Sequence, residues 1–215
     1  MKRLGVDYVD LYQCHRYDED TPLEETLRTL DDLVRQGRVL YVGVSEWTAD
    51  QIANALRLAK EMNFDRIVSN QPRYNMIQRQ IEAEIIPMCE REGVGQVVFS
   101  PLAQGVLTGK YRPGEAPQRG TRAADPESKR FMQQLMNEEV LSAVGKLRRV
   151  ASDAGLSMSQ LALAWTLQHD NVSSAIIGAS RPEQVEDNAE AAGVRLSPEV
   201  ISEIDSILKS VIERS

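Results

Sequence analysis

Apolar runs rich in β-branched residues alternate along the chain with runs whose apolar positions recur at helical spacing. The apolar runs cover residues 8–14, 39–44, 66–70, 94–100 and 173–179. The first four begin about 30 residues apart, which is the length of one strand and one helix in a parallel α/β unit. The pattern predicts five buried parallel strands with helices packed over them.

The segment after the first predicted strand has the features of a helix start. Thr21, Pro22 and Glu24 fit a capping box with proline at the first helical position, and Gly37 marks the helix end. The apolar face of this helix comprises Leu23, Leu27, Leu30 and Val34. This face should cover the sheet.

Later segments repeat the arrangement. A second helix should follow Thr48, and a third should occupy residues 78–92, bent at Pro87 and closed by Gly93. The inward positions of the second helix are Ile52, Leu56 and Ala59. Further helices are predicted over 138–153 and 157–169, after Ser180 and after Ser197.

Residues 100–137 show neither the apolar runs of strands nor the apolar spacing of helices, and they are rich in Gly, Pro, Arg and Gln. A connection of this length is usually functional or disordered. No low-complexity segment or interdomain linker occurs elsewhere, so the sequence predicts one domain over residues 1–215.

Parallel strands of this period belong either to an open doubly wound sheet or to a (β/α)8 barrel. A polar cluster follows the carboxyl end of each predicted strand: Gln13 and His15, Ser45 and Glu46, Asn70 and Gln71, Ser100, and Ser180. Five polar ends that meet at one rim are typical of the catalytic face of a barrel, although an open sheet also gathers ligands at its carboxyl edge. The pattern therefore favours the α/β class and, within it, the (β/α)8 TIM barrel.

Composition narrows the classes of partner. The chain of 215 residues is 42% hydrophobic and carries a formal net charge of −7. This acidity argues against a nucleic-acid surface, so any phosphate should be bound by a local site. Cys14 and Cys89 lie far apart with no CxxC or histidine cluster, which indicates neither a disulfide framework nor a metal site. Because no signal peptide or apolar stretch of spanning length occurs, we expect a cytoplasmic protein without membrane insertion.

Residues 176–188 run from an apolar strand directly into a helix. Gly178 allows close backbone approach there, and the helix start supplies N–H groups and a partial positive charge. Ser180 and Arg181 add a hydroxyl and a guanidinium, and Gln184 lies one turn further on. This junction could hold a phosphate; an ordinary helix cap with solvated charges is the alternative.

Two further features could carry chemistry. In the segment 100–111, Gly105 and Gly109 flank an apolar turn before Lys110, which suggests phosphate contact, or else a glycine-rich turn with a solvated lysine, since P-loop spacing is absent. His15 ends the first strand, where an imidazole can donate a hydrogen bond to a carbonyl or transfer a proton near neutral pH. A structural role for this lone histidine is the alternative.

Five stretches together resemble the aldo-keto reductase superfamily: "DYVDLYQCHRYD", "TLDDLVRQGRVLYVGVSEW", "NQPRYNM", "FSPLAQGVLTGKY" and "IIGASRPEQVEDN". The match covers nearly the whole chain in the expected order. It is closest to the branch that includes potassium-channel β-subunit-like reductases and bacterial NADP-dependent oxidoreductases. The resemblance implies a (β/α)8 barrel that binds extended NADPH without a Rossmann domain and reduces aldehydes and ketones to alcohols.

The resemblance also implies roles for individual residues. His15 corresponds to the carbonyl-facing histidine, Ser45 and Gln71 to residues that hold the nicotinamide carboxamide, and Phe99 to the ring that stacks on the nicotinamide. The implied contacts to the remainder of NADP are Ser100, Leu102, Lys110 and Arg122 for the pyrophosphate and ribose, Gly178, Ser180 and Gln184 for the 2′-phosphate, and Asp187 and Asn188 for the adenine. Glu46 departs from the Asn or Arg common at its position.

A larger departure concerns the proton donor. In the family a tyrosine, assisted by a lysine and an aspartate, protonates the substrate, and all three lie on strands before the one that carries His15. The resemblance therefore implies that about the first three strand–helix units of the barrel are missing from this sequence, and we expect the isolated chain to be weakly active or inactive. A truncated or mis-started gene product, a processed fragment, and a short protein that assembles with a partner are the three explanations.

Three functions remain open from the sequence. The first is an NADPH-dependent reductase acting on a small carbonyl substrate. The second is a non-catalytic nicotinamide-binding module that regulates a partner protein. The third is a phosphate-binding barrel fragment without redox chemistry. A homo-oligomer or a complementing chain is compatible with each, since five strands cannot close an eight-stranded barrel and the first would expose its edge.

Overall fold

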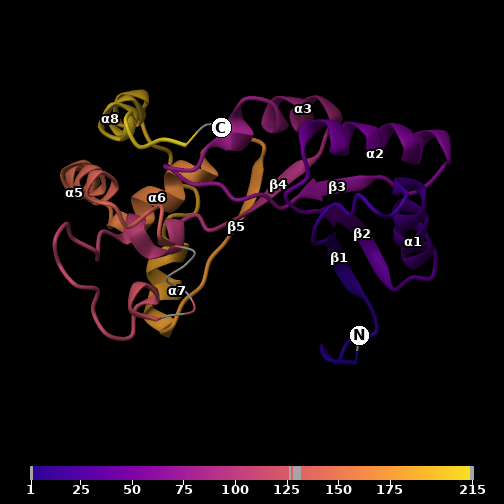
Figure 1. Cartoon of the computed structure of the whole chain (residues 1–215), viewed down its shortest axis with the longest axis horizontal. Helices are drawn as coiled ribbons and strands as arrows, with labels where there is room; N and C mark the ends of the chain where they lie inside the picture. Colours follow the sequence, from indigo (N-terminus) through magenta and orange to yellow (C-terminus); the bar gives the residue numbers. More distant parts are fainter. Residues whose placement is uncertain (1, 126, 128–131, 214–215) are drawn as a thin grey trace. The chain divides into compact units, whose positions relative to one another are not determined.

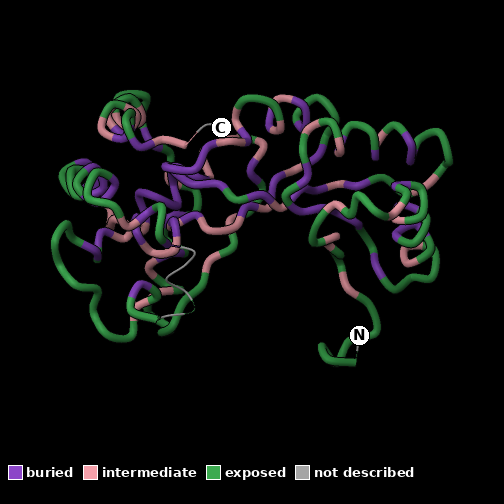
Figure 2. The backbone as a smooth tube through the Cα atoms, in the orientation of Figure 1, coloured by how far each residue is buried: buried purple, intermediate pink, exposed green. Residues whose placement is uncertain are grey.

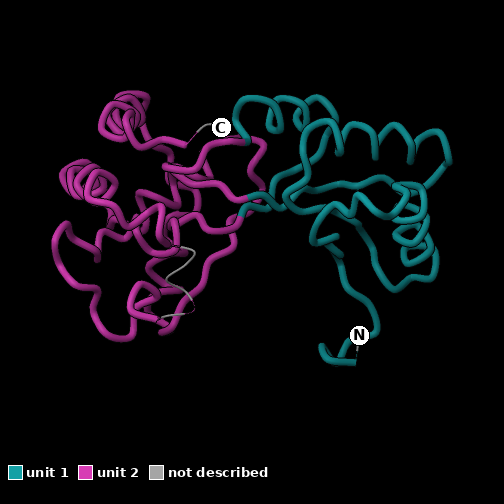
Figure 3. The backbone as a smooth tube through the Cα atoms, viewed as in Figure 1, with its two compact units in different colours: residues 1–72, 81–98 teal, residues 73–80, 99–215 magenta. Residues whose placement is uncertain are grey.

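The computed structural model describes residues 2–125, 127 and 132–213. The chain divides into two compact units (Figure 3). Unit 1 comprises Met1–Pro72 and Ile81–Val98, and unit 2 comprises Arg73–Gln80 and Phe99–Ser215. The single domain expected from the sequence stays a prediction, and the two units are described separately below.

Unit 1 is built on parallel strands that pair in chain order (Figure 1). The strands are β1 (Val9–Cys14), β2 (Val39–Val44), β3 (Ile67–Asn70) and β4 (Gly95–Phe99), whose last residue falls in unit 2. The helices between them are α1 (Leu23–Arg35), α2 (Ala49–Glu61) and α3 (Ile85–Glu92). A doubly wound sheet reverses its strand order at a switch point, whereas a barrel adds strands in sequence. The order β1-β2-β3-β4 confirms the predicted barrel type of α/β fold.

The core of unit 1 forms where the helices cover one face of these strands (Figure 2). As the periodicity predicts, α1 buries Leu23, Leu27 and Leu30, and α2 buries Ile52 and Ala59. The strands and the segment after β2 contribute Val42, Val44, Ile67 and Trp47. Burial of these side chains is the main source of stability in the unit.

Two helix starts differ from their predictions. The Thr21 capping box is wrong, because Pro22 is the N-cap of α1 and the Thr21 hydroxyl donates to Asp18 at 2.8 Å instead. The predicted helix over 78–92 is also wrong at its start. A short 3₁₀ turn, η1 (Gln80–Glu82), comes first, and α3 begins only at Ile85. Pro87 therefore lies in the first turn of α3, where a missing N–H costs nothing, and does not bend a longer helix.

The helix start at Thr48 and the ends at Gly37 and Gly93 agree with prediction. Thr48 and Gln51 form a capping box, with Thr48 Oγ1 accepting from the Gln51 amide at 3.2 Å. Gly37 has φ 66° and Gly93 has φ 67°. Both are left-handed conformations that glycine adopts without steric cost after a helix.

The expectation of five buried strands is wrong for β1, whereas the expectation that the first strand exposes its edge is confirmed. Leu11 is 37% exposed and Tyr12 is 45% exposed, and β2 adds exposed Tyr41. Among the described residues, β1 pairs with β2 and lies at the edge of the sheet. An edge strand lacks neighbours on one side, so its side chains stay accessible.

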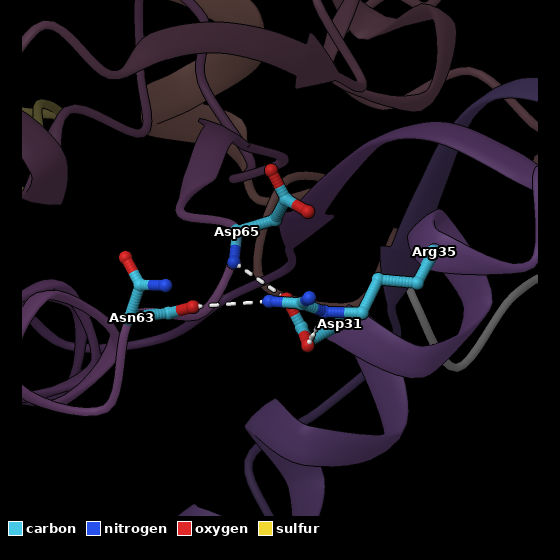
Figure 4. Close-up of polar contacts among 4 residues, drawn as sticks. All are labelled: Asp31, Arg35, Asn63 and Asp65. Atoms are coloured by element: carbon cyan, nitrogen blue, oxygen red, sulfur yellow. Dashed lines mark hydrogen bonds and ion pairs between the residues drawn. The ribbon is translucent and has the colours of Figure 1, made fainter.

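A buried carboxylate joins α1 to the loop before β3 (Figure 4). Asp31 is buried; it accepts from Arg35 Nε at 2.5 Å and from the Asp65 amide at 2.8 Å. Arg35 also donates to the Asn63 carbonyl at 3.1 Å. Burial alone would raise the pKa of the Asp31 carboxyl, but the hydrogen bonds and charge of its partners outweigh it and hold the pKa below its ordinary value.

Among its described residues, unit 2 contains one complete strand, which packs mainly against α6, and several helices. Its elements are η2 (Ala103–Thr108), η3 (Arg122–Ala124), α5 (Glu138–Asp153), α6 (Met158–Leu167), β5 (Val172–Ile176), α7 (Pro182–Ala189) and α8 (Pro198–Leu208). The buried apolar residues Leu107, Leu147, Leu161 and Ile204 come from four of these elements. β5 exposes Ile176, so the prediction of a fully buried fifth strand is wrong as well. The predicted structureless loop over 100–137 contains η2 and η3, and part of it lies outside the described residues.

Candidate functional site

A cavity of about 560 Å³ lies within unit 2. Its walls come from the segment after β4, from residues 120–122 and from the segment that links β5 to α7, with Ser159 of α6 added. Ten residues singled out in the sequence line this cavity: Phe99, Ser100, Leu102, Lys110, Arg122, Gly178, Ser180, Gln184, Asp187 and Asn188. The fold thus brings together residues that are as much as 89 positions apart in the sequence.

The segment after β4 turns sharply around one side of the cavity. Ser100, Ala103 and Gln104 have φ angles of 56°, 47° and 57°, and Gly105 has φ 94°. Left-handed backbone at three non-glycine residues is strained and persists only where surrounding contacts hold it. The glycines of this stretch suggest a turn, but the sequence gives no signal that Ser100, Ala103 and Gln104 adopt this conformation.

Two cationic side chains reach the cavity. Arg122 Nη1 donates a hydrogen bond to Gln104 Oε1, and Gln104 Nε2 donates to Ser100 Oγ at 2.5 Å. A Cβ added at Gly105 would lie 2.9 Å from Lys110 Nζ, so the absent side chain gives the lysine its place against the turn. A guanidinium, an ammonium and a hydroxyl on one wall suit an anionic group such as a phosphate.

The start of α7 forms another wall. The Ser180 amide and hydroxyl both donate to Gln184 Oε1, at 2.8 and 3.2 Å. The helix expected after Ser180 is present, but Arg181 is its N-cap and provides no side-chain cap hydrogen bond. The first-turn N–H groups of α7 thus lie beside the Ser180–Gln184 pair without a side-chain cap of their own.

Asp187 and Asn188, on α7, lie at the same cavity. The Asp187 carboxylate accepts from Gln160 Nε2 at 3.0 Å and from Ser157 Oγ at 3.3 Å. Ser157 and Gln160 also form the capping box of α6. These contacts fix α7 to the start of α6, and a ligand at Asp187 would share the carboxylate with them.

The predicted site residues of unit 1 form a second group. Ser45 Oγ donates to the Gln71 carbonyl at 2.8 Å, so the residues after β2 and β3 are held together. Arg16 donates to the His15 carbonyl at 2.8 Å and to Ser45 Oγ at 3.4 Å. His15, Ser45 and Gln71 therefore belong to one hydrogen-bonded chain along the carboxyl ends of β1, β2 and β3. Arg16, which makes the link, was not singled out in the sequence.

Cys14 precedes His15 and is half-buried. Burial raises the pKa of its thiol above the ordinary value, a hydrogen bond with the Arg16 backbone opposes this, and the nearby Asp18 carboxylate reinforces it. A thiol with a raised pKa is protonated at neutral pH and is a poor nucleophile. Cys14 is therefore not a candidate for covalent catalysis.

Sequence reasoning missed several cavity residues. Gln104, Thr108 and Thr121 come from the long connection, Ile176 is the last residue of β5, and Ile177 follows it. Ser159 comes from α6, which the sequence marks only as an ordinary capped helix. Proximity in sequence to Ser100, Lys110 and Gly178 is the one signal that could have identified most of them; for Ser159 there is none.

Two further kinds of site are absent from the described part of the chain. No group of three or more His, Cys, Asp and Glu side chains there is arranged to hold a metal ion. None of the helices in that part combines the length and apolar character needed to cross a bilayer.

Comparison with known proteins identifies relatives along the whole chain. The family described as "Aldo/keto reductase family" matches residues 1–209. The chain is 38% identical over 218 residues to a protein of Oryza sativa subsp. japonica and 39% identical over 217 residues to one of Arabidopsis thaliana, both named "Probable voltage-gated potassium channel subunit beta". It is 35% identical over 207 residues to "L-glyceraldehyde 3-phosphate reductase" of Escherichia coli strain K12.

These matches differ in how much of each protein they cover. They include 100% of this chain for the two plant proteins and 95% for the bacterial reductase. The same matches cover only 66% of each plant protein and 60% of the bacterial reductase. The chain therefore spans slightly less than two thirds of the length of the curated relatives that it matches.

Proposed function

The chain belongs to the aldo/keto reductase family, and on this premise we propose that it forms the NADPH-binding part of an oxidoreductase that reduces aldehydes and ketones to alcohols. The observation that carries the proposal is the cavity of unit 2, which is lined by ten residues that the family resemblance links to NADPH. A volume of about 560 Å³ lies within the range of small-molecule and cofactor sites.

The donor set of the cavity fits a dinucleotide. Lys110 and Arg122 supply positive charge for the pyrophosphate, and Gly105 leaves room for the lysine ammonium beside the turn. Ser180 and Gln184, together with the uncapped first turn of α7, suit the 2′-phosphate. Asn188 and the exposed Ile176 are suited to the adenine.

The residues of the chain have distinct roles in the proposed reaction. Bound NADPH supplies a hydride to the carbonyl carbon of the substrate. The Ser45 hydroxyl and the Gln71 side chain would hold the nicotinamide carboxamide, and the Phe99 ring would stack on the nicotinamide. His15 would donate a hydrogen bond to the substrate carbonyl oxygen and so polarise it. Arg16, bonded to Ser45 and to the His15 carbonyl, would keep these two residues in register.

The proton donor that the family resemblance assigns, a tyrosine with a lysine and an aspartate, has no counterpart among these 215 residues. Loss of a general acid commonly costs about 10²–10⁴ in rate. We therefore propose that this chain by itself binds NADPH and turns over carbonyl substrates weakly or not at all. Reduction of 4-nitrobenzaldehyde by the isolated chain at ordinary enzyme rates would contradict this part of the proposal.

A non-catalytic, nicotinamide-binding regulatory subunit is the second candidate. It is favoured by the names of the two plant relatives, which describe potassium channel subunits. The two candidates share NADPH binding and differ in turnover. The test needs a form that also contains the proton donor. If such a form binds NADPH tightly but does not oxidise it in the presence of any aldehyde or ketone tested, the regulatory role is favoured.

The cofactor assignment is tested by titrating the chain with NADPH and NADH and following cofactor fluorescence. Ser180→Ala combined with Gln184→Ala should weaken NADPH binding about tenfold, the loss of one or two hydrogen bonds to a charged group, and leave NADH binding nearly unchanged. Ser197→Ala, which removes a helix cap on α8 away from the cavity, serves as the matched control. Equally poor binding of both cofactors, unaffected by the double substitution, would refute the assignment.

A further inference from the structure

Asn75 is fully buried in unit 2 and uses its whole hydrogen-bonding capacity. Its Oδ1 accepts from the amides of Ile77 and Gln78 at 3.0 and 2.9 Å. Its Nδ2 donates to Gln78 Oε1 at 3.1 Å and to the Ser100 carbonyl at 3.0 Å. An asparagine amide has two donor hydrogens and two acceptor lone pairs, so all four are engaged here. No other side chain of this size both donates two hydrogen bonds and accepts two.

The bond to Ser100 reaches the strained turn of the cavity. The Ser100 carbonyl also accepts from the Ala103 amide at 2.9 Å, so two donors fix its direction. Ser100 has φ 56°, which a serine adopts only when its neighbours hold it. The Tyr74 amide donates to the Phe99 carbonyl at 3.3 Å, which places Asn75 in register with the turn.

The segment that carries Asn75 is itself anchored from behind. The Arg79 side chain is 3% exposed, forms an ion pair with Asp205 at 2.8 Å and lies 4.3 Å from the Trp165 ring centroid. The Arg79 amide donates to the Glu213 carbonyl at 2.9 Å. These contacts tie the segment that carries Asn75 to α8 and to the C-terminal segment.

We propose that Asn75 is a positioning residue: its side-chain amide holds the Ser100 peptide in the left-handed conformation that shapes the phosphate end of the cavity. Asn75 does not line the cavity and acts through Ser100, which does. The inference rests on the proposed function in one respect, namely that the cavity binds the phosphates of NADPH. The effect of Asn75 on the turn itself is independent of any ligand.

Hydrogen exchange in the full chain without cofactor tests whether Asn75 holds the turn at Ser100. Asn75→Asp keeps the acceptor for Ile77 and Gln78 but places an oxygen against the Ser100 carbonyl. Exchange at the Ala103 and Gly105 amides should become about tenfold faster, since the opening of the turn loses one hydrogen bond and gains a repulsion. Asn137→Asp is the matched control, because Asn137 also accepts from a backbone amide and donates to a carbonyl, at an exposed helix cap. Unchanged exchange in Asn75→Asp would overturn the proposal.

A rescue experiment tests whether Asn75 affects NADPH binding through the backbone conformation of Ser100. Glycine adopts a left-handed φ without strain, so Ser100→Gly should make Asn75 dispensable. In the Ser100 background, Asn75→Asp should weaken NADPH binding about fivefold to tenfold; in the Ser100→Gly background the same substitution should weaken it less than about twofold. Equal losses in both backgrounds would mean that Asn75 acts on stability alone, and the proposal would fail.

The outcomes separate this inference from the proposed function. If the unchanged chain does not bind NADPH, the proposed function fails, while hydrogen exchange still decides the role of Asn75. If NADPH binds and Ser180→Ala with Gln184→Ala weakens it, but Asn75→Asp has no effect, only this inference fails. Should Asn75→Asp not fold, the side-chain amide protons of Asn75 in the unchanged chain provide the readout. They should exchange more slowly when NADPH is bound, and unaltered exchange would count against the proposal.

Discussion

Arg122 Nη1 donates a hydrogen bond to Gln104 Oε1 and so joins the 120–122 segment to the strained turn that follows β4. The same guanidinium lies near Gly178, where an added Cβ would be 3.5 Å from Arg122 Nη2. Arg122 therefore touches two walls of the cavity that are far apart in the sequence.

Arg122→Ala should weaken NADPH binding about tenfold at low ionic strength, because a guanidinium beside a phosphate contributes both charge and hydrogen bonds. The difference from the unchanged chain should shrink when salt is raised to about 1 M, where charges are screened within a few ångströms. Fluorescence titration at two salt concentrations measures both effects. Arg119→Ala, an exposed arginine of the same connection that does not line the cavity, should change neither value.

Lys110→Met should reduce the affinity for NADPH by roughly fivefold to tenfold while leaving thermal stability nearly unchanged, since the substitution removes a charge and keeps the length of the side chain. Calorimetric titration provides the binding constant, and thermal unfolding monitors the fold. Lys146→Met on α5 alters the net charge equally but lies outside the cavity. If the two variants bind NADPH alike, Lys110 has no specific role.

Asp31→Asn should lower the free energy of unfolding at pH 7 by about 2 kcal/mol, the order of hydrogen bonds to a charged group. The folded-state pKa of Asp31 lies below its ordinary value of about 4. The stabilisation is therefore complete above that ordinary value and disappears as the pH falls through the lowered one. Urea unfolding should therefore show a smaller difference between the two chains near pH 3 than at pH 7, and the difference should keep shrinking as the pH is lowered further.

The exposed neighbour Asp32 provides the control for this series. Asp32→Asn should change the free energy of unfolding by less than about 0.5 kcal/mol at either pH. A loss in Asp31→Asn that persists undiminished near pH 3 would show that the side chain stabilises by packing and not by its charge.

Gly43→Ala should destabilise the chain by about 1–3 kcal/mol through overpacking. A Cβ at Gly43 would lie 2.8 Å from the Ser69 carbonyl oxygen and would collide with the Gln13 and Ser69 side chains, which are hydrogen-bonded to each other at 3.1 Å. Gly145→Ala is the matched control: it lies within α5, and an added Cβ meets nothing within 4 Å. That variant should be more stable by about 0.5–1 kcal/mol, because alanine is the better helix former. Thermal unfolding of both variants checks the opposite signs.

Local signals in the sequence were sufficient to predict most of the helices and strands. The bounds of β2 and α5 agree with prediction, because an apolar run of strand length and a long helical period leave little choice. Helix starts were less predictable. Thr21 fits a capping box as well as Thr48 does, yet its hydroxyl is bonded to Asp18, a competition between local hydrogen bonds that the sequence does not resolve.

The residues of the candidate site likewise fall into those with a local sequence signal and those without one. Ser180, Lys110 and Gly178 were identifiable because a helix start and a glycine-rich turn have local signatures. Asn75 and Ser159 were not, because their roles depend on which segments fold against them: Asn75 meets Ser100 across 25 positions, and Ser159 reaches the cavity from another helix. The left-handed backbone of Ser100 likewise depends on tertiary contacts and not on residue type.

The parallel register of unit 1 has a consequence for how the chain reaches its native state. Val9 lies opposite Val39 and Ser69 lies opposite Gly95, so each pairing joins residues separated by an entire helix. No β-hairpin can form early and template the rest of the sheet, because every ladder must first close a long loop. Refolding of unit 1 is therefore expected to be slow for its size and governed by chain topology, with helices formed before their strands are paired.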